Sequence, residues 1–209
     1  MSPLDLIPFI LHIDQYISLF LQSYGILTYF ILFAIIFIET GLVIMPFLPG
    51  DSLLFVAGAF AAKGDLNIFI LLISLTVAAI LGDSLNYALG TRFGEYFTKK
   101  NWIKEAHLKR TQHFFETYGG KTIILARFVP IIRTIAPFVA GIGSMSYKKF
   151  LSYNIIGGIL WISLLLLAGF FLGSFQLIQD NLTLVILIIV FLSILPAIIE
   201  YLRERKAKP

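Results

Sequence analysis

Long apolar stretches separated by short polar segments make up most of this chain. Residues 24–45, 66–90 and 150–173 each provide about twenty residues or more, which is the length that an α-helix needs to cross about 30 Å of hydrocarbon. A further apolar stretch covers about 182–201, close to the C-terminus. The pattern predicts an all-α polytopic membrane protein that ends in a C-terminal transmembrane helix.

Proline and glycine interrupt this apolar background in two places. The sequence PFLPGD occupies residues 46–51, and residues 122–143 contain Pro130, Pro137 and the pair Ala140–Gly141. Proline removes a backbone donor, and unpaired backbone groups in hydrocarbon have no water to bind, so neither segment can continue as a lipid-exposed helix. Each is therefore expected to form a re-entrant helical hairpin.

Two amphipathic segments are expected at the membrane surface. Residues 4–21 combine apolar side chains with Asp5, His12 and Asp14, and they contain no lysine or arginine. This composition favours an interfacial helix that is retained in the mature chain, rather than a cleaved signal peptide. Residues 91–121 form the largest polar connection, with seven basic and three acidic residues, and apolar residues at helical spacing within it predict a second helix on anionic headgroups.

The order of interfacial helix, broken hairpin and long span occurs twice. One copy covers about 4–90 and the other about 104–173, all within a single membrane domain of residues 1–209. The basic connection at about 91–121 and the basic C-terminus are expected on the cytoplasmic side. The two copies then run in opposite directions, as in secondary transporters that place a substrate site at the midplane between inverted repeats.

Composition narrows the functional classes. The chain is 58% hydrophobic and 13% charged, its net charge is +4, and it has no cysteine. The positive charges flank apolar segments, which favours membrane topology over nucleic-acid binding. No HExxH, GxSxG or Walker motif is present, and the histidines lack the spacing of metal ligands, so the chain is not expected to be an enzyme or to hold a metal or cofactor.

Five ionisable residues lie within or beside the apolar stretches: Glu39, Asp51, Asp83, Arg127 and Arg133. A charge at the centre of a spanning helix costs about 2.5–3.5 kcal/mol, so five isolated charges would cost on the order of 15 kcal/mol. We expect two acids of the first hairpin, Glu39 and Asp51, to meet two arginines of the second hairpin, Arg127 and Arg133, at the midplane of the membrane. Paired guanidinium groups suit a phosphate, and the carboxylates suit proton coupling.

Other readings of these polar residues stay open. A neutral cluster of buried ion pairs could simply join the two hairpins. Asp83 and Asn86 share a helix face and could line the same cavity or form a structural pair. Asn154 is a further cavity-lining candidate, although a polar contact between helices explains it better, and packing is the better explanation for Trp161.

Several of these motifs together resemble the bacterial DedA family, which is related to the SNARE-associated Golgi proteins and the VTT-domain superfamily. The resemblance covers about residues 20–175 and rests on the following: Phe37-Ile38-Glu39, PFLPGD at 46–51, Gly82-Asp83, Asn86-Tyr87, Gly90, RFVP at 127–130, Arg133-Thr134, Pro137, Ala140-Gly141, Met145, Phe150, Asn154, Gly157 and Trp161. The resemblance implies lipid translocation, such as recycling of undecaprenyl phosphate or flipping of a phospholipid, often with dependence on proton motive force. It also implies that Glu39, Asp51, Arg127 and Arg133 are essential.

The leading hypothesis is a flippase-like or scramblase-like transporter of a phosphate-bearing lipid in a bacterial inner membrane, multi-pass, with a cytoplasmic C-terminus. Arg127 and Arg133 would bind the phosphate, while Glu39 and Asp51 would couple its movement to protons. One alternative is a proton-coupled transporter of small ions or solutes, and another is a membrane scaffold that transports nothing. The expected partners are membrane lipids and protons but no nucleic acid, and the sequence leaves a homo-oligomer open.

Overall fold

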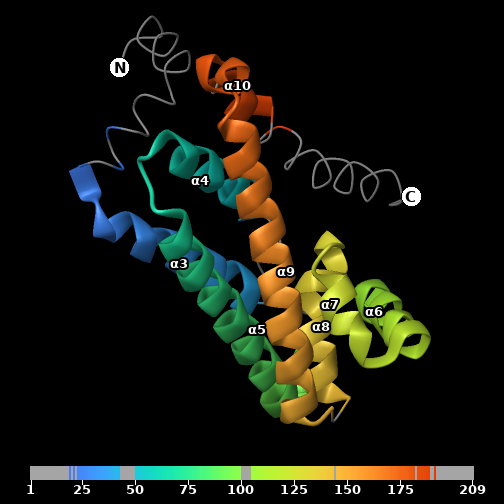
Figure 1. Ribbon diagram of the computed structural model, residues 1–209. Coiled ribbons are helices and arrows are strands. Elements are labelled where there is room, and N and C mark those ends of the chain that lie inside the picture. Colours follow the sequence, from blue (N-terminus) through green and yellow to red (C-terminus); the bar gives the residue numbers. More distant parts are fainter. Residues whose placement is uncertain are drawn as a thin grey trace, which may run out of the picture. The chain divides into compact units, whose positions relative to one another are not determined.

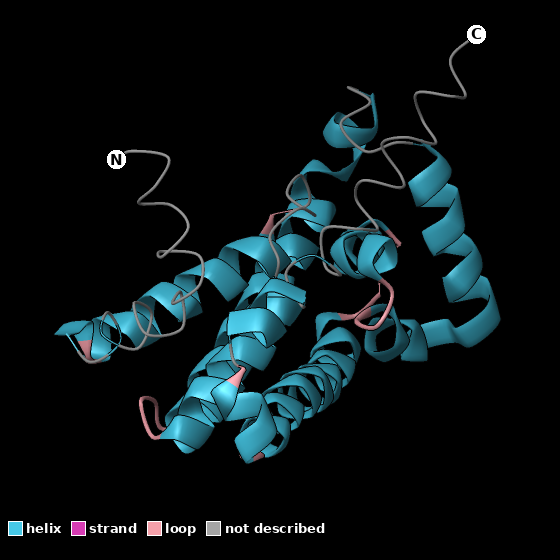
Figure 2. Cartoon of the chain, turned by 90° about the horizontal axis from the view of Figure 1, so that it is seen from above, coloured by secondary structure: helices cyan, strands magenta, loops and turns pink. Residues whose placement is uncertain are grey.

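The computed structural model describes residues 19, 21, 23–42, 50–99, 105–143, 145–181, 183–188 and 191. Within these ranges the regular structure is entirely helical (Figures 1 and 2), which confirms the predicted all-α class for this part of the chain. The helices are α3 (Ile26–Gly41), α4 (Gly50–Lys63), α5 (Ile68–Lys99), α6 (Glu105–Tyr118), the short 3₁₀ helix η1 (Gly119–Lys121), α7 (Thr122–Ala126), α8 (Pro130–Ile142), α9 (Tyr147–Gly173) and α10 (Gln176–Asp180).

Among the described residues, two helices are long and apolar enough to cross a membrane, namely α5 over Ile68–Gly94 and α9 over Tyr147–Gly173. The helix extends beyond the apolar segment 66–90, because α5 continues to Lys99. The added residues carry charges that disfavour hydrocarbon but not a helix, so hydropathy marks the end of the apolar span and not the end of the helix. By contrast, α3 has 16 residues and measures about 24 Å, which is shorter than the hydrocarbon core.

Some predicted elements lie outside the described residues. These are the N-terminal interfacial helix except for its last residues, the interruption at 46–49 and most of the C-terminal span. The inverted arrangement of the two repeats stays a prediction.

The chain forms two compact units. The first comprises residues 1–30, 49–71 and 164–209, and in it α4 packs against the C-terminal part of α9. A Cβ atom added at Gly58 would clash with the carbonyl group of Leu166, and one added at Gly169 would clash with that of Phe55. Together with Gly173, Gly169 forms a GxxxG spacing, which allows two helix backbones to approach closely in a membrane.

The second unit comprises residues 31–48 and 72–163, and it contains most of the charged candidates. Here the backbones of α5 and α8 nearly touch, since a Cβ atom at Gly90 would clash with the Phe138 carbonyl and one at Gly141 with the Tyr87 carbonyl. Gly82 gives α5 the same close approach to the last turn of α3, at Thr40. Polar side chains on α5 are thereby brought close to both neighbouring helices.

The helix predicted in the basic connection is present as α6, and Gly119, with φ +57°, follows its last residue. Its apolar side chains Leu108, Phe114 and Phe115 pack against a core to which α7 and α8, beside α6 in Figure 1, contribute most residues. The expected position of this helix on anionic headgroups stays a prediction. An amphipathic pattern shows that one face is buried, but the same pattern suits a protein surface and a membrane surface.

Candidate functional site: two buried arginine–carboxylate pairs

The break between α7 and α8 positions both arginines. Arg127 directly follows the last residue of α7, and Val129 is extended, with φ −121° and ψ 104°, as the residue before a proline usually is. Pro130 then begins α8, where its fixed φ and missing N–H do no harm, and Arg133 lies one turn later. A continuous helix would direct two residues six positions apart to different sides, whereas this break allows both guanidinium groups to reach one neighbour.

Arg127 is held by groups on two other helices. Its Nη2 donates to Oδ2 of Asp83 at 2.6 Å and to Oδ1 of Asn154. The amide group of Asn154 donates in turn to the Ile80 carbonyl at 3.0 Å, which fixes the orientation of the Asn154 oxygen. Arg127 and Asp83 are each only 2% exposed. Asp83, for which the sequence left open a cavity-lining or a structural role, is therefore the direct partner of Arg127.

Arg133 forms the second pair. Its Nη2 donates to Oε1 of Glu39 at 2.6 Å, and Glu39 is 1% exposed in the last turn of α3. The two residues are 94 positions apart in the chain. Two acids and two arginines thus form two buried pairs in the second unit with no net formal charge.

Trp161 of α9 contacts both arginines. The central guanidinium carbon lies 5.8 Å from its ring centroid for Arg127 and 4.8 Å for Arg133. The electron-rich face of an indole attracts cations, most strongly where water is excluded, and Trp161 is 2% exposed. Sequence reasoning took Trp161 for a packing residue. Its position seven residues after Asn154, on the same helix face, was the available signal.

Gly157 makes room for Arg127 between Asn154 and Trp161. A Cβ atom there would lie 3.0 Å from Cδ and from Nε of Arg127. The face of α9 that carries these three residues therefore supports the arginine along its length. Sequence reasoning assigned no role at the site to this glycine.

Asn86 connects the two helices that carry the second ion pair. Its Nδ2 donates to the carbonyl of Thr40 at 3.1 Å and to that of Thr134 at 2.8 Å. The Thr40 carbonyl is among the last in α3, where carbonyl groups have no donor within their own helix. Asn86 therefore satisfies the end of α3 and joins α3 to α8 beside Glu39 and Arg133.

Replacing Asn86 with leucine, which has a similar shape, is expected to lower the free energy of unfolding by about 1–2 kcal/mol, because two carbonyl groups lose a donor. Unfolding by sodium dodecyl sulfate in mixed micelles measures the change. Asn181→Leu is the matched control, since the exposed Asn181 amide only donates to the local Leu177 carbonyl. An equal loss in both variants would contradict the connecting role of Asn86.

Some hydrogen-bonding capacity in the cluster is unused. Among the residues that the structure describes, Oδ1 of Asp83, Oδ1 of Asn86, and Nε and Nη1 of Arg127 have no hydrogen-bond partner, although all are buried. Buried polar groups in proteins are normally paired, and a purely structural cluster is expected to satisfy its own donors and acceptors. These atoms give the site both donors and acceptors for a polar ligand.

Asp51 lies in the other unit, in the first turn of α4, and is partly buried. The predicted interruption ended at this residue, whereas α4 already begins at Gly50. An acid in the first turn interacts favourably with the helix dipole. Its role in proton coupling stays a prediction. Within the described ranges, no three histidine, aspartate or glutamate side chains come together as metal ligands.

Comparison with known proteins gives a consistent family assignment. Residues 48–171 match the model of the VTT domain. The chain is 52% identical to "Protein DedA" of Escherichia coli K12 in an alignment 207 residues long, which covers 97% of this chain and 94% of that protein. It is 46% identical to an uncharacterized membrane protein of Mycobacterium leprae, with 79% of this chain and 75% of that protein covered. For "Inner membrane protein YqjA" of Escherichia coli K12 the identity is 38%, with 70% and 68% covered. No solved structure matches the chain.

Proposed function

Because the chain belongs to the DedA family of VTT-domain membrane proteins, we propose that it moves a phosphate-bearing lipid across the bacterial inner membrane. The lipid is a polyprenyl phosphate or a phospholipid, and Arg127 and Arg133 bind its phosphate. One observation carries the proposal: two buried arginines both lie near the ring of Trp161, and each is paired with a buried carboxylate that an anionic ligand can replace.

The chemistry of the arginines suits this ligand. A guanidinium group offers five N–H donors in a planar fork that matches the oxygens of a phosphate. In Arg127, Nε and Nη1 are buried and have no hydrogen-bond partner among the described residues, so both donors remain for a phosphate that enters the cluster. The lipid tail stays in the hydrocarbon beside the apolar surfaces of α5 and α9, so only the headgroup needs the polar site.

Charge balance supplies a reason for proton coupling. The two ion pairs are neutral together, so a phosphodiester group would bring one uncompensated negative charge into a buried site. A buried net charge is costly, and protonation of one carboxylate removes it. Proton uptake is therefore expected to accompany lipid binding, with Glu39 and Asp83 as the acids nearest to the arginines and Asp51 as a further proton-carrying acid.

The test is transport of a fluorescent phosphatidylethanolamine in reconstituted vesicles, with dithionite reduction reporting the fraction in the outer leaflet. The wild-type protein is expected to move the lipid faster than protein-free vesicles do. Arg127→Gln and Arg133→Gln are each expected to reduce this movement at least tenfold, because a phosphate then loses its charged donors. Arg110→Gln, which removes an exposed arginine of α6, is the matched control and is expected to transport normally.

Other outcomes favour the alternatives. Undiminished lipid movement in the two arginine variants would overturn the proposal. Proton flux that a soluble solute drives, without regard to lipid identity, would support an ion or solute transporter. A wild-type protein with no flux of any kind, but with lower thermal stability in both arginine variants, would support a scaffold.

A further inference from the structure

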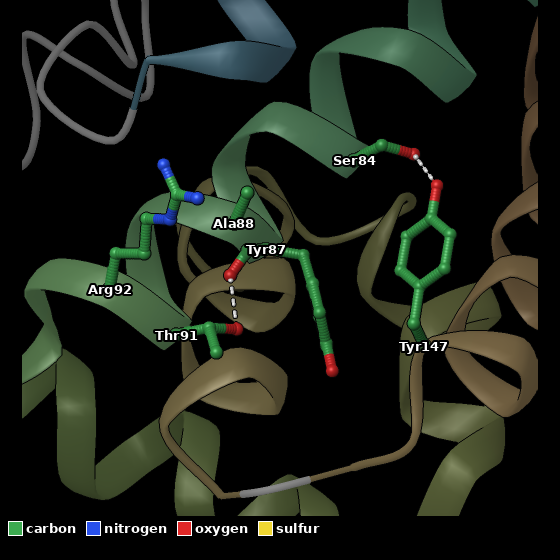
Figure 3. A pocket seen from close by; sticks show the side chains of 6 residues that line it. All are labelled: Ser84, Tyr87, Ala88, Thr91, Arg92 and Tyr147. Carbon is green, nitrogen blue, oxygen red and sulfur yellow. Dashed lines mark hydrogen bonds between the residues drawn. The ribbon is translucent and has the colours of Figure 1, made fainter.

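A pocket of about 300 Å³ lies on the second unit, outside the ion-pair cluster. Figure 3 shows it between α5 and Tyr147, the first residue of α9. Its lining consists of Ser84, Tyr87, Ala88, Thr91, Arg92 and Tyr147. The five α5 residues follow the spacing i, i+3, i+4, i+7 and i+8, so they form one continuous stripe of that helix.

Hydrogen bonds and ring contacts hold the pocket walls in place. The Tyr147 hydroxyl donates to Oγ of Ser84 at 3.3 Å and closes one end. The Tyr87 hydroxyl donates to the Met145 carbonyl, and the Tyr87 ring stacks on Phe150 with a centroid distance of 4.5 Å. A pocket whose walls are already ordered loses less conformational entropy when a ligand binds.

The stripe connects the level of the ion pairs with the basic end of α5. Ser84 directly follows Asp83, and Arg92 lies two residues before the end of the apolar span at Gly94. From Ser84 to Arg92 the helix rises about 12 Å. Lys148 and Lys149 follow Tyr147 and are exposed. Arg92 is therefore the positive charge in the pocket lining, two further lysines follow the lining residue Tyr147 in sequence, and Ser84 lies one residue from a member of the candidate site.

We propose that this pocket binds a phosphate-bearing membrane lipid from the leaflet on the basic side, before the headgroup reaches Arg127 and Arg133. The phosphate is held by Arg92, and the first part of the lipid tail lies against Ala88 and the rings of Tyr87 and Tyr147. This inference rests on the proposed function and adds a separate entry site to it. Neither Arg92 nor the tyrosines belong to the ion-pair cluster.

Three features favour a lipid over a soluble phosphate. Although several lining residues carry a polar group, most of the surface that lines the pocket is apolar, which suits a hydrocarbon tail. The neighbouring α5 residues Leu81 and Leu85 are exposed, as side chains that face lipid are expected to be. Tyrosine and arginine at the end of a span also match the interfacial region, where apolar and polar groups meet.

The test uses a photo-crosslinker in place of Ala88, in nanodiscs of digalactosyldiacylglycerol, a bilayer lipid without a phosphate group. Each preparation contains a small, equal fraction of radiolabelled phosphatidylglycerol or radiolabelled diacylglycerol with the same acyl chains. The expected result is at least fivefold more labelling by phosphatidylglycerol, because diacylglycerol lacks the phosphate. Equal labelling by the two lipids would overturn the proposal. So would displacement of the label by excess glycerol phosphate, which would indicate a site for soluble phosphates.

The role of Arg92 is tested in the same preparation. Arg92→Gln is expected to lower labelling by phosphatidylglycerol about fivefold and to leave labelling by diacylglycerol unchanged. Arg110→Gln, an exposed arginine outside the pocket, serves as the control and is expected to label as the unaltered chain does. Equal labelling in the Arg92 and Arg110 variants would overturn the proposal. Unchanged melting temperatures show that the variants are folded.

The design separates this inference from the proposed function. In Arg133→Gln, labelling at position 88 is expected to persist although transport is lost, because binding in the pocket precedes the arginine pair. If phosphatidylglycerol labels position 88 selectively but the wild-type chain moves no lipid, the proposed function is wrong and the pocket proposal is supported. If it moves lipid but Arg92→Gln labels normally, the pocket proposal alone fails.

Discussion

Replacing Arg127 with methionine is expected to lower the free energy of unfolding by about 3–5 kcal/mol and to abolish lipid transport. The large loss follows from Asp83, which is 2% exposed and would remain as a buried carboxylate without its cation. Unfolding by sodium dodecyl sulfate in mixed micelles measures stability, and the vesicle assay described above measures transport.

A double variant separates stability from function. Arg127→Met combined with Asp83→Asn removes both charges, so most of the lost stability is expected to return. Transport is expected to stay absent, because the arginine that binds the lipid phosphate is still missing. Two results would contradict this account: a single variant that loses less than about 1 kcal/mol, and a double variant that transports lipid like the wild type.

Replacing Trp161 with alanine is the second change with a large expected effect, a loss of about 3–5 kcal/mol. Part of this loss comes from the cavity left by a buried indole, and part from the attraction between its ring and two guanidinium groups, which lie 5.8 and 4.8 Å from the centroid. The same unfolding measurement applies.

Two further variants divide these contributions. Trp161→Phe retains an aromatic face and is expected to keep measurable transport, whereas Trp161→Leu fills space without that face and is expected to lose transport. Phe60→Leu is the matched control in the first unit, because Phe60 is also buried and its ring also lies near a cation, Lys63. It is expected to lower stability but not transport. Equal transport in the leucine and phenylalanine variants of Trp161 would show that the ring only fills volume.

The predictions from sequence were reliable where the physics is local. Hydropathy located α5 and α9, the apolar helices that are long enough to span, and Pro130 together with the preceding Arg127-Phe128-Val129 located the break that positions two charges. Hydropathy did not show that α5 continues to Lys99, because charged residues end an apolar run without ending a helix. The packing of α6 side chains against the core of α7 and α8 could not be predicted either, because periodicity identifies a buried face but not what covers it.

The sequence by itself determined the class of the protein, its helical character and the positions at which charge enters apolar segments. These follow from composition and from interactions within a few residues. Only the tertiary structure decided that Arg127 pairs with Asp83, 44 positions away, and that Arg133 pairs with Glu39, 94 positions away. It also decided that the ring of Trp161 lies near both guanidinium groups. The reason is that ion pairing depends on which helix backbones approach each other, and glycines such as Gly82 and Gly90 allow that approach only once the fold has brought their partners together.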